Sequence, residues 1–360
     1  MADTGVNSEV VTSARAINKT SAAASAALPE YILSADSHAT EPDGLWDDMP
    51  PDLHERLPLF IGRNKRPEGI TDPAIRIKAQ DADQIAGEVL YPGRALSIFA
   101  ADPDVQPLAM RIYNDWLGAF CKGSPKRLFG VPAVPAYNID EAIAEMHRDH
   151  DLGLHGALLW EVPHKSLPFD SPHYEKLWAA AAEMEAPICL HILTGFNYAM
   201  KRTTDPTERI NEQANIKMAE FITSLFQIVW SGAFDRHPKL KLGMIESEIG
   251  WLPFLLQQWD YYFERNRRAT PDLSNYKIKR LPSEIFREHV SVTFMDDQVG
   301  AEALTDWGQR NCMWNSDYPH PNMTWPDSRA FIAKQIGGLP RDVQERLLSK
   351  NVIDLFSLPV

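Results

Sequence analysis

Two imidazoles and two carboxylates follow short apolar segments that are far apart in the chain. Asp36 and His38 come directly after a first predicted strand and are two residues apart, so in extended backbone both side chains point to the same face. His191 lies near the end of a later apolar run, and Asp317 ends the last one. A set of two nitrogen and two oxygen donors suits Zn²⁺, Mn²⁺ or Fe²⁺, with positions left for water and substrate.

Further carboxylates occur at other predicted strand ends. Glu246 and Glu248 are two residues apart and share one face of an extended strand; Glu246 is nearer the strand and is the preferred candidate. Helix capping before Gly250 is the alternative for this pair, and a salt bridge is the alternative for Glu88 at the second strand. If two of these carboxylates reach the centre, it can hold one or two ions, with manganese or iron favoured.

Residues near these positions are candidates for substrate contacts. His320 and Tyr318 flank Asp317, so we expect His320 to act in catalysis and Tyr318 to bind substrate, although turn structure also explains Tyr318. His164, after the fourth strand, is a substrate-binding candidate or a solvated loop histidine. Four aromatic residues either line a bulky apolar pocket or belong to the core; Trp314 is the candidate for substrate binding, and the others are Trp46, Phe196 and Trp325.

Eight short apolar runs alternate with amphipathic stretches, which favours a closed parallel (β/α)₈ barrel, the TIM-barrel architecture of the α/β class. The predicted strands are Tyr31–Ala35, Glu88–Tyr91, Leu128–Val134, Gly156–Trp160, Pro187–Ile192, Lys239–Glu246, Val290–Phe294 and Cys312–Asp317. The predicted helices are Asn138–Asp149, Pro172–Glu185, Glu208–Ser231 and Trp251–Arg265. Two segments break the alternation and are expected to be insertions after strands 1 and 6, namely Pro42–Lys78 and Thr270–Glu284. In such a barrel the carboxyl ends of the strands meet at one face, where the candidate ligands would gather.

Composition excludes several classes of protein. The chain has 360 residues and a net charge of −13, without a long basic block, so nucleic acid is not an expected partner. Three widely spaced cysteines fit neither a disulfide framework nor a Cys-type zinc site, and no apolar stretch approaches the length of a membrane span. Residues 1–28 read as a disordered leader before one barrel domain, 29–360. We expect a cytoplasmic homo-oligomer that does not bind membranes.

Five segments resemble the amidohydrolase-related family, the branch of the amidohydrolase superfamily that includes aminocarboxymuconate-semialdehyde decarboxylase and resorcylate-type decarboxylases. They are Ser34–Pro42, Glu88–Pro92, Pro187–His191, Ile245–Pro253 and Asn315–Pro321. The resemblance implies that Asp36, His38 and His191 bind the metal, and that Asp317 is a ligand or proton shuttle. Many members carry a histidine after the sixth strand, where this chain has Glu246-Ser-Glu248.

Three functional hypotheses follow from these residues. The first is a metal-dependent hydrolase or decarboxylase that acts on a small carboxylated, cyclic organic acid through a metal-bound water or a metal-polarised substrate. The second is a non-heme iron oxygenase or hydroxylase, mononuclear or di-iron, suggested by the surplus of carboxylates. The third is a non-catalytic binding barrel, which predicts that the four candidate ligands are scattered in space.

Overall fold

The structure is a computed structural model. It describes residues 28–59, 70–195, 205–270, 276–304 and 306–360, without the side chains of residues 206 and 209–217. All but the last residue of the predicted leader, Phe196 and parts of both predicted insertions therefore lie outside the described residues. Within them, all eight predicted strands are present, each within a few residues of its expected position. They are β1 (Leu33–Ala39), β2 (Gly87–Pro92), β3 (Leu128–Gly130), β4 (Ala157–Val162), β5 (Ile188–Gly195), β6 (Leu242–Ile245), β7 (Val290–Phe294) and β8 (Cys312–Trp314).

The strands form two parallel sheets, β1-β2-β3 and β4-β5-β6-β7-β8. Backbone contacts join the sheets at both pairs of facing edges. Leu158 N donates to Pro132 O at 2.8 Å and Val134 N to Leu158 O at 3.1 Å, beside an isolated parallel bridge between Ala133 and Leu158. At the other edges His38 N donates to Tyr318 O at 2.8 Å and Asp317 N to Asp36 O at 3.1 Å. The eight parallel strands are thereby arranged as in a (β/α)₈ barrel.

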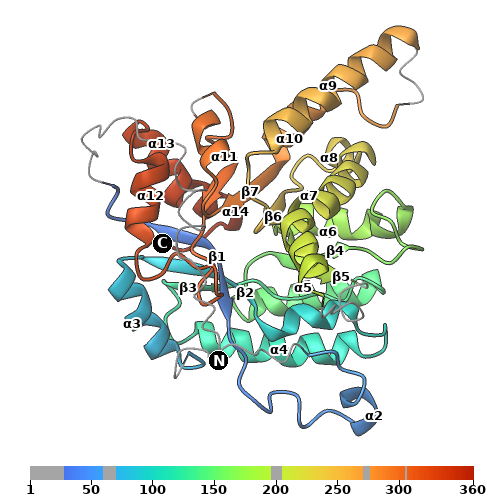
Figure 1. The fold of residues 1–360 in the computed structure, drawn as a ribbon. Coiled ribbons are helices and arrows are strands. Elements are labelled where there is room, and N and C mark those ends of the chain that lie inside the picture. The colour runs from blue at the N-terminus through green and yellow to red at the C-terminus, as the bar shows by residue number, and fades with distance from the viewer. Residues whose placement is uncertain (1–27, 60–69, 196–204, 271–275, 305) are drawn as a thin grey trace, which may run out of the picture.

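Helices surround the strands, as Figure 1 shows. The helices predicted from periodicity are all present, with ends shifted by a few residues. Asn138 begins α5 as expected from its polar side chain, which accepts hydrogen bonds from the amides of Asp140 and Glu141. The α-helices are α2 (Pro51–His54), α3 (Pro73–Asp83), α4 (Gln106–Cys121), α5 (Ile139–Asp151), α6 (Glu175–Met184), α7 (Pro206–Trp230), α8 (Ala233–Arg236), α9 (Leu252–Ala269), α10 (Pro282–His289), α11 (Gln298–Ala303), α12 (Ser328–Ile336), α13 (Arg341–Glu345) and α14 (Asn351–Phe356). Short 3₁₀ or π turns are η1 (Arg94–Ala100), η2 (Pro172–Tyr174) and η5 (Arg346–Lys350).

The two segments predicted as insertions join elements of the barrel. The first contains α2 and the start of α3, and the second links α9, which projects from the body in Figure 1, to α10. The core is continuous from the strands to the inner faces of the helices. All three cysteines are buried and free. Among the described helices, none combines the length and apolarity that crossing a bilayer requires.

The turn between α5 and β4 contains two glycines, and substituting each one separates the cost of a strained backbone from the cost of a steric clash. Gly153 and Gly156 both have positive φ, +85° and +71°. A methyl group at Gly153 meets nothing within 4 Å, whereas one at Gly156 lies 2.8 Å from Pro187 O. We expect Gly153→Ala to lower the free energy of unfolding by about 1 kcal/mol, the cost of a left-handed alanine. Gly156→Ala should cost clearly more, because β4 has to move away from β5.

Urea unfolding of the two variants and the parent chain measures both costs. Equal destabilisation by the two substitutions would contradict this packing of β4 against the start of β5.

Candidate metal centre

Asp36 and His38 lie inside β1 and not after it, because this strand continues four residues beyond its predicted end. Both side chains are buried, with exposures of 0% and 1%. His191 is on β5, and the register pairs it with Ile245, the last residue of β6. Glu246 follows directly, so the ends of β1, β5 and β6 bring their polar residues together.

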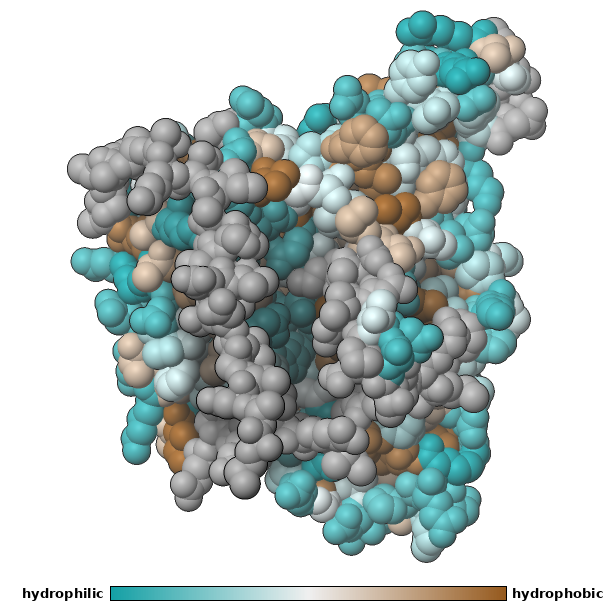
Figure 2. Space-filling model, viewed as in Figure 1, coloured by the Kyte–Doolittle hydropathy of each residue, from teal (hydrophilic) through white to brown (hydrophobic). Residues whose placement is uncertain are grey.

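Two overlapping groups of donor atoms result. In each group, every residue offers one ligand atom, and these atoms all lie within 4.8 Å of one another. The first group consists of Asp36, His38, His191 and Glu246; the second consists of His38, Glu246, Asp317 and His320. His191 Nε2 is 3.6 Å from Asp36 Oδ1 and 3.9 Å from Glu246 Oε2. His38 Nε2 is 3.8 Å from Asp36 Oδ1 and 3.3 Å from Asp317 Oδ1. Figure 2 shows a hollow with a hydrophilic floor in the middle of the face in view, near the position of β1 in Figure 1.

The two imidazole rings are oriented as metal ligands require. His38 Nδ1 is 2.6 Å from Pro92 O and His191 Nδ1 is 2.8 Å from Ile192 O. Since a carbonyl oxygen only accepts, both rings donate through Nδ1, which leaves the lone pair on Nε2. Within the described part of the chain, neither Nε2 atom nor Asp36 Oδ1 has a hydrogen-bond partner, although all three are buried. Such donors match a divalent cation.

The charges around the site are dominated by carboxylates. Burial lowers the pKa of His191, but Asp36 and then Glu246 raise it above its usual value overall. For His320 burial again acts downward, while Asp317, Glu246 and Asp36 raise the pKa to about 9. The pKa of Asp317 is well below its usual range, because the attraction of His320 and His38 outweighs burial. A cation between these groups would offset the surplus of negative charge.

Backbone conformation at the strand ends points to a functional site as well. Glu246 and Asp317 have φ values of 59° and 54°, in the left-handed region that non-glycine residues seldom adopt. Glu246 N donates to Thr293 Oγ1 at 2.7 Å, and Asp317 N is held by Asp36 O. Each such residue costs about 1–3 kcal/mol unless its surroundings hold it, and these conformations cluster at functional sites.

Asp317 forms a close pair with His320. His320 Nδ1 lies 2.8 Å from Asp317 Oδ1, and the ring of His320 is 3.8 Å from that of His38 between centroids. Asp317 is fully buried, whereas the side chain of His320 is 30% exposed. The pair therefore connects the buried ligand group to the partly open side of the site.

The structure brings together Asp36, His38, His191, Glu246, Asp317 and His320, and it places three other candidates elsewhere. Glu88 is not in either ligand group, because Arg76 Nε binds its carboxylate at 2.6 Å and Gln80 Nε2 binds it at 2.7 Å. Glu248 accepts from Met295 N at 3.2 Å, towards β7. His164 is 2.8 Å from Ser166 Oγ in the loop after β4.

The aromatic candidates pack against neighbouring elements. The guanidinium carbon of Arg76 lies over the ring of Tyr318, 4.5 Å from the centroid of that ring. The ring of Tyr318 also contacts the ring of Trp325. The indole N–H of Trp325 donates to Ala79 O, and that of Trp46 donates to Ala109 O. Trp314 is buried in β8, with an indole N–H that lacks a partner among the described residues. Contact of these side chains with a substrate stays a prediction.

Sequence reasoning missed Arg76, which holds the two sides of the site together. Its guanidinium donates to His38 O at 2.8 Å and to Tyr318 O at 3.1 Å, in addition to Glu88, and it is 1% exposed. Arg76 thus fixes the backbone of one ligand and of the residue after Asp317. From the sequence alone an arginine is expected at the protein surface, and for Arg76 that expectation is wrong.

Glu41 was also missed, and it fixes the loop after β2. Its buried carboxylate accepts from the amides of Gly93, Arg94 and Ala95 at 3.0, 2.7 and 3.0 Å. A Cβ at Gly93 would lie 2.9 Å from Ala39 O. Pro92, the last residue of β2, directly precedes this loop, so Glu41 indirectly holds the carbonyl that orients the ring of His38.

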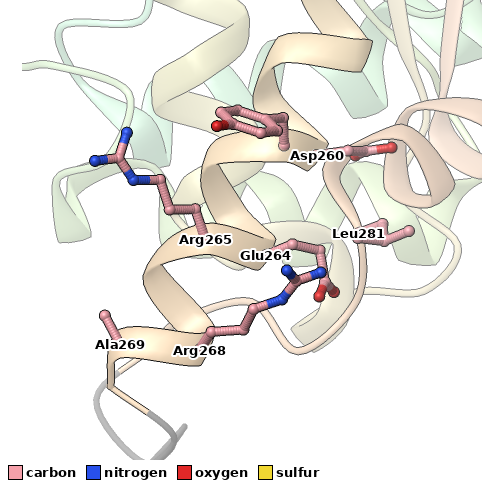
Figure 3. A pocket seen from close by; sticks show the side chains of 7 residues that line it. Asp260, Glu264, Arg265, Arg268, Ala269 and Leu281 are labelled. Carbon is pink, nitrogen blue, oxygen red and sulfur yellow. The ribbon is translucent and has the colours of Figure 1, made fainter.

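The surface pockets on α9 and α10 are separate from this centre. The first is lined by residues that include Asp260, Glu264, Arg265 and Arg268, whose side chains spread along α9 in Figure 3. The second lies around Glu288 and Trp307. Neither contains a candidate ligand, and their charged side chains pair with neighbours or face solvent.

Removal of Arg76 should destabilise the protein strongly, because it leaves Glu88 charged and buried without a counter-ion. We expect Arg76→Met to lower the free energy of unfolding by about 3–5 kcal/mol. The double variant with Arg76→Met and Glu88→Gln should lose less free energy of unfolding than the variant with Arg76→Met alone. Lys176→Met, which removes the exposed ion pair with Asp140, should change stability by no more than about 0.5 kcal/mol.

Chemical denaturation of the four proteins measures these differences. Equal stability of Arg76→Met and Lys176→Met would show that the buried pair does not hold β1 to the loop after β8.

Comparison with known proteins agrees with this geometry. The sequence profile of a family described as Amidohydrolase matches residues 35–358. A gamma-resorcylate decarboxylase from Rhodococcus jostii (strain RHA1) is 26% identical over 236 residues, 58% of this chain and 66% of the relative. The chain thus matches slightly less than two thirds of that relative's length.

Solved structures show the same fold. An amidohydrolase from Mycobacterium avium subsp. paratuberculosis K-10 superposes with a TM-score of 0.73 at 18% identity, over 93% of this chain and 99% of the other. A dihydroxybenzoic acid decarboxylase from Polaromonas sp. JS666, with bound manganese and 2-nitroresorcinol, gives a TM-score of 0.67 at 20% identity, over 92% and 98%. With the family profile covering most of its length, the chain belongs to the amidohydrolase family.

Proposed function

We propose that the chain is a metal-dependent decarboxylase of a small aromatic carboxylic acid, with Mn²⁺ as its ion. The observation that carries the proposal is the buried set of Asp36 Oδ1, His38 Nε2 and His191 Nε2, which lack partners among the described residues and lie beside the Asp317–His320 pair. Donors of this kind suit Mn²⁺.

Asp36, His38 and His191 would hold the ion, and Asp317 or Glu246 would complete its ligands. When bound, the ion supplies a positive charge that orients the substrate's oxygens and stabilises negative charge as it develops. The residues around it have fixed orientations, since both imidazoles are tied to carbonyl oxygens and Asp36 Oδ2 is 3.5 Å from Asn315 Nδ2. Little reorganisation is then needed during the reaction.

Decarboxylation replaces CO₂ on the ring carbon with a proton, so the site needs a group that holds this proton nearby. His320 Nδ1, 2.8 Å from Asp317 Oδ1, can hold the proton and pass it to this carboxylate, and Asp317 can then deliver it to the ring carbon. His320 is the more exposed of the two and can exchange protons with solvent. The arrangement is a two-residue proton relay.

Glu246 stands where many members of the family carry a histidine. A carboxylate there accepts hydrogen bonds or binds a cation, but it does not donate a proton as an imidazolium does. Proton delivery is therefore assigned to Asp317 and His320, and the position of Glu246 in both ligand groups favours a role towards the metal.

The relatives support a proposal for the substrate class. One acts on gamma-resorcylate, and a neighbour carries 2-nitroresorcinol with manganese. Both compounds are benzene rings with hydroxyl groups beside an anionic or nitro substituent. We therefore propose an aromatic acid with a hydroxyl group next to its carboxylate.

Hydrolysis and O₂-dependent hydroxylation would use the same ligands and stay alternative predictions. Hydrolysis would consume water and release no CO₂, and hydroxylation would require O₂. The third hypothesis, a non-catalytic barrel, predicted scattered ligands. The gathering of Asp36, His38 and His191 in one ligand group, with His38 joined to Asp317 in the other, argues against it.

The experiment incubates the Mn²⁺-loaded protein with 2,6-dihydroxybenzoate and other ortho-hydroxy aromatic acids in D₂O, with and without O₂. We expect CO₂ release independent of O₂ and one deuterium at the ring carbon that lost its carboxylate. His320→Gln should slow turnover by about 10²–10⁴-fold, since it removes an acid–base group, while metal content stays unchanged. His173→Gln is the matched control, because His173 binds Ala136 O away from the site.

Absence of CO₂ from every acid, with manganese bound, would refute the decarboxylase. Turnover that requires O₂ would support hydroxylation in its place.

A further inference from the structure

The helix α9 projects from the body of the molecule, as Figure 1 shows, and it exposes several aromatic side chains. Nine large hydrophobic side chains are exposed among the described residues, and five of them lie on α9 and α7. Those on α9 are Phe254, Tyr261 and Tyr262, with exposures of 67%, 58% and 52%; those on α7 are Met218 and Phe226. Figure 2 shows hydrophobic side chains where α9 leaves the body. A gathering of this kind indicates a contact surface, whereas single exposed hydrophobic residues are ordinary.

The helix α9 has an inner face that packs against the body and an outer face that does not. Its buried residues follow one another at intervals of four, three and four positions; they are Leu252, Leu256, Trp259 and Phe263. Trp259 contacts Phe226 of α7, with 5.7 Å between the ring centroids. Since each residue turns the helix by about 100°, Phe254 and Tyr261 lie on the side opposite this buried row.

One stripe on the outer face of α9 is aromatic in its first half and basic in its second half. Phe254, Tyr261, Arg265 and Arg268 are spaced by seven, four and three residues, which places them in one line along a helix. Both arginines are exposed, and Figure 3 shows the side chain of Arg265 extending away from the helix. The stripe therefore offers aromatic rings at one end and guanidinium groups at the other.

A second copy of α9, running antiparallel, complements this stripe. With a two-fold axis at Tyr261, residues at equal distances before and after that position face each other. The two Tyr261 rings then meet, and Arg268 of each copy faces Phe254 of the other, since both are seven residues from Tyr261. A guanidinium group over an aromatic ring is an attractive arrangement. An acidic partner would leave the rings uncovered and an apolar partner would leave the arginines without a counterpart, so a second copy fits best.

The exposed area is of the order that a stable dimer needs. A fully covered aromatic side chain contributes about 150–250 Å², so the exposed parts of the three α9 rings amount to about 350 Å². A stable interface buries about 800 Å² on each partner. The rings would supply nearly half of this area, and the stems of the arginines and the exposed side chains of α7 would add to it.

We propose that α9 forms the centre of a two-fold interface between two copies of this chain, in which the aromatic half of each helix lies against the basic half of the other. No residue of the stripe belongs to either metal-ligand group, so this inference is independent of the proposed decarboxylase.

Sedimentation equilibrium of the full chain measures the association. We expect a dimer at micromolar concentration, and a monomer after Tyr261→Asp, which brings two carboxylates together at the axis. Arg268→Glu should raise the dissociation constant of the dimer about 10–100-fold, because it removes two contacts between a guanidinium group and a ring. Tyr31→Asp and Arg310→Glu are matched controls at exposed positions outside α9 and should leave the dimer intact.

Oxidative cross-linking tests the antiparallel direction of the two helices. The three native cysteines are buried and should not react. Tyr261→Cys should form a disulfide between the two copies on mild oxidation, because this position lies on the axis. Phe254→Cys should not, since the two copies of that position would be about 21 Å apart along the helices, at about 1.5 Å per residue.

A monomeric wild-type protein would overturn the interface, as would a dimer that persists in Tyr261→Asp. A disulfide in Phe254→Cys without one in Tyr261→Cys would overturn the antiparallel arrangement. Release of CO₂ from an aromatic acid is measured separately, so either proposal can fail while the other stands.

Discussion

Burial of negative charge at the carboxyl ends of the strands is the constraint on which this structure depends. Asp36 and Asp317 are fully buried, and Glu246 lies beside them with an exposure of 10%. Ionised groups are expensive to remove from water unless opposite charges compensate them. Near Asp317 the compensation comes from His320 and His38, but Asp36 Oδ1 lacks a partner within the described residues. The site is organised to hold at least one cation.

The donors keep their positions because the backbone around them is fixed by other buried polar groups. Arg76 ties the carbonyls of His38 and Tyr318 together and is itself neutralised by Glu88. Glu41 holds the loop directly after Pro92, whose carbonyl is the acceptor for the ring of His38. These residues touch no ligand atom of the site, yet they decide where the ligand atoms lie. Such support is typical of metal centres, whose ligands are oriented by the residues behind them.

The sequence predicted the strands and most of the ligand group because both leave local signals. Parallel strands are continuous apolar runs, and a polar residue at the end of such a run is conspicuous. The ends of strands were harder to predict. β1 runs through Asp36 and His38, since metal ligands interrupt the apolar pattern without ending the strand. β6 stops at Ile245, because Glu246 takes up a left-handed conformation that an extended strand does not allow. β8 ends at Trp314, before the left-handed Asp317.

Arg76 and Glu41 could not be found in this way. Each is a charged residue buried by tertiary contacts, whereas a charged residue in the sequence indicates a surface position. For Glu88 the sequence left a metal ligand and a salt bridge open, because a carboxylate on a strand fits both. The structure shows the salt bridge, formed with an arginine 12 positions earlier in the chain.

Anomalous scattering from Mn²⁺-loaded crystals, recorded at the manganese edge, tests the central claim most directly. We predict a strong peak bonded to Asp36, His38 and His191, within about 2.0–2.3 Å of Nε2 of both histidines. A well-ordered crystal with no peak at these three residues, or with manganese only at the protein surface, would contradict the account of a buried cation at the strand ends.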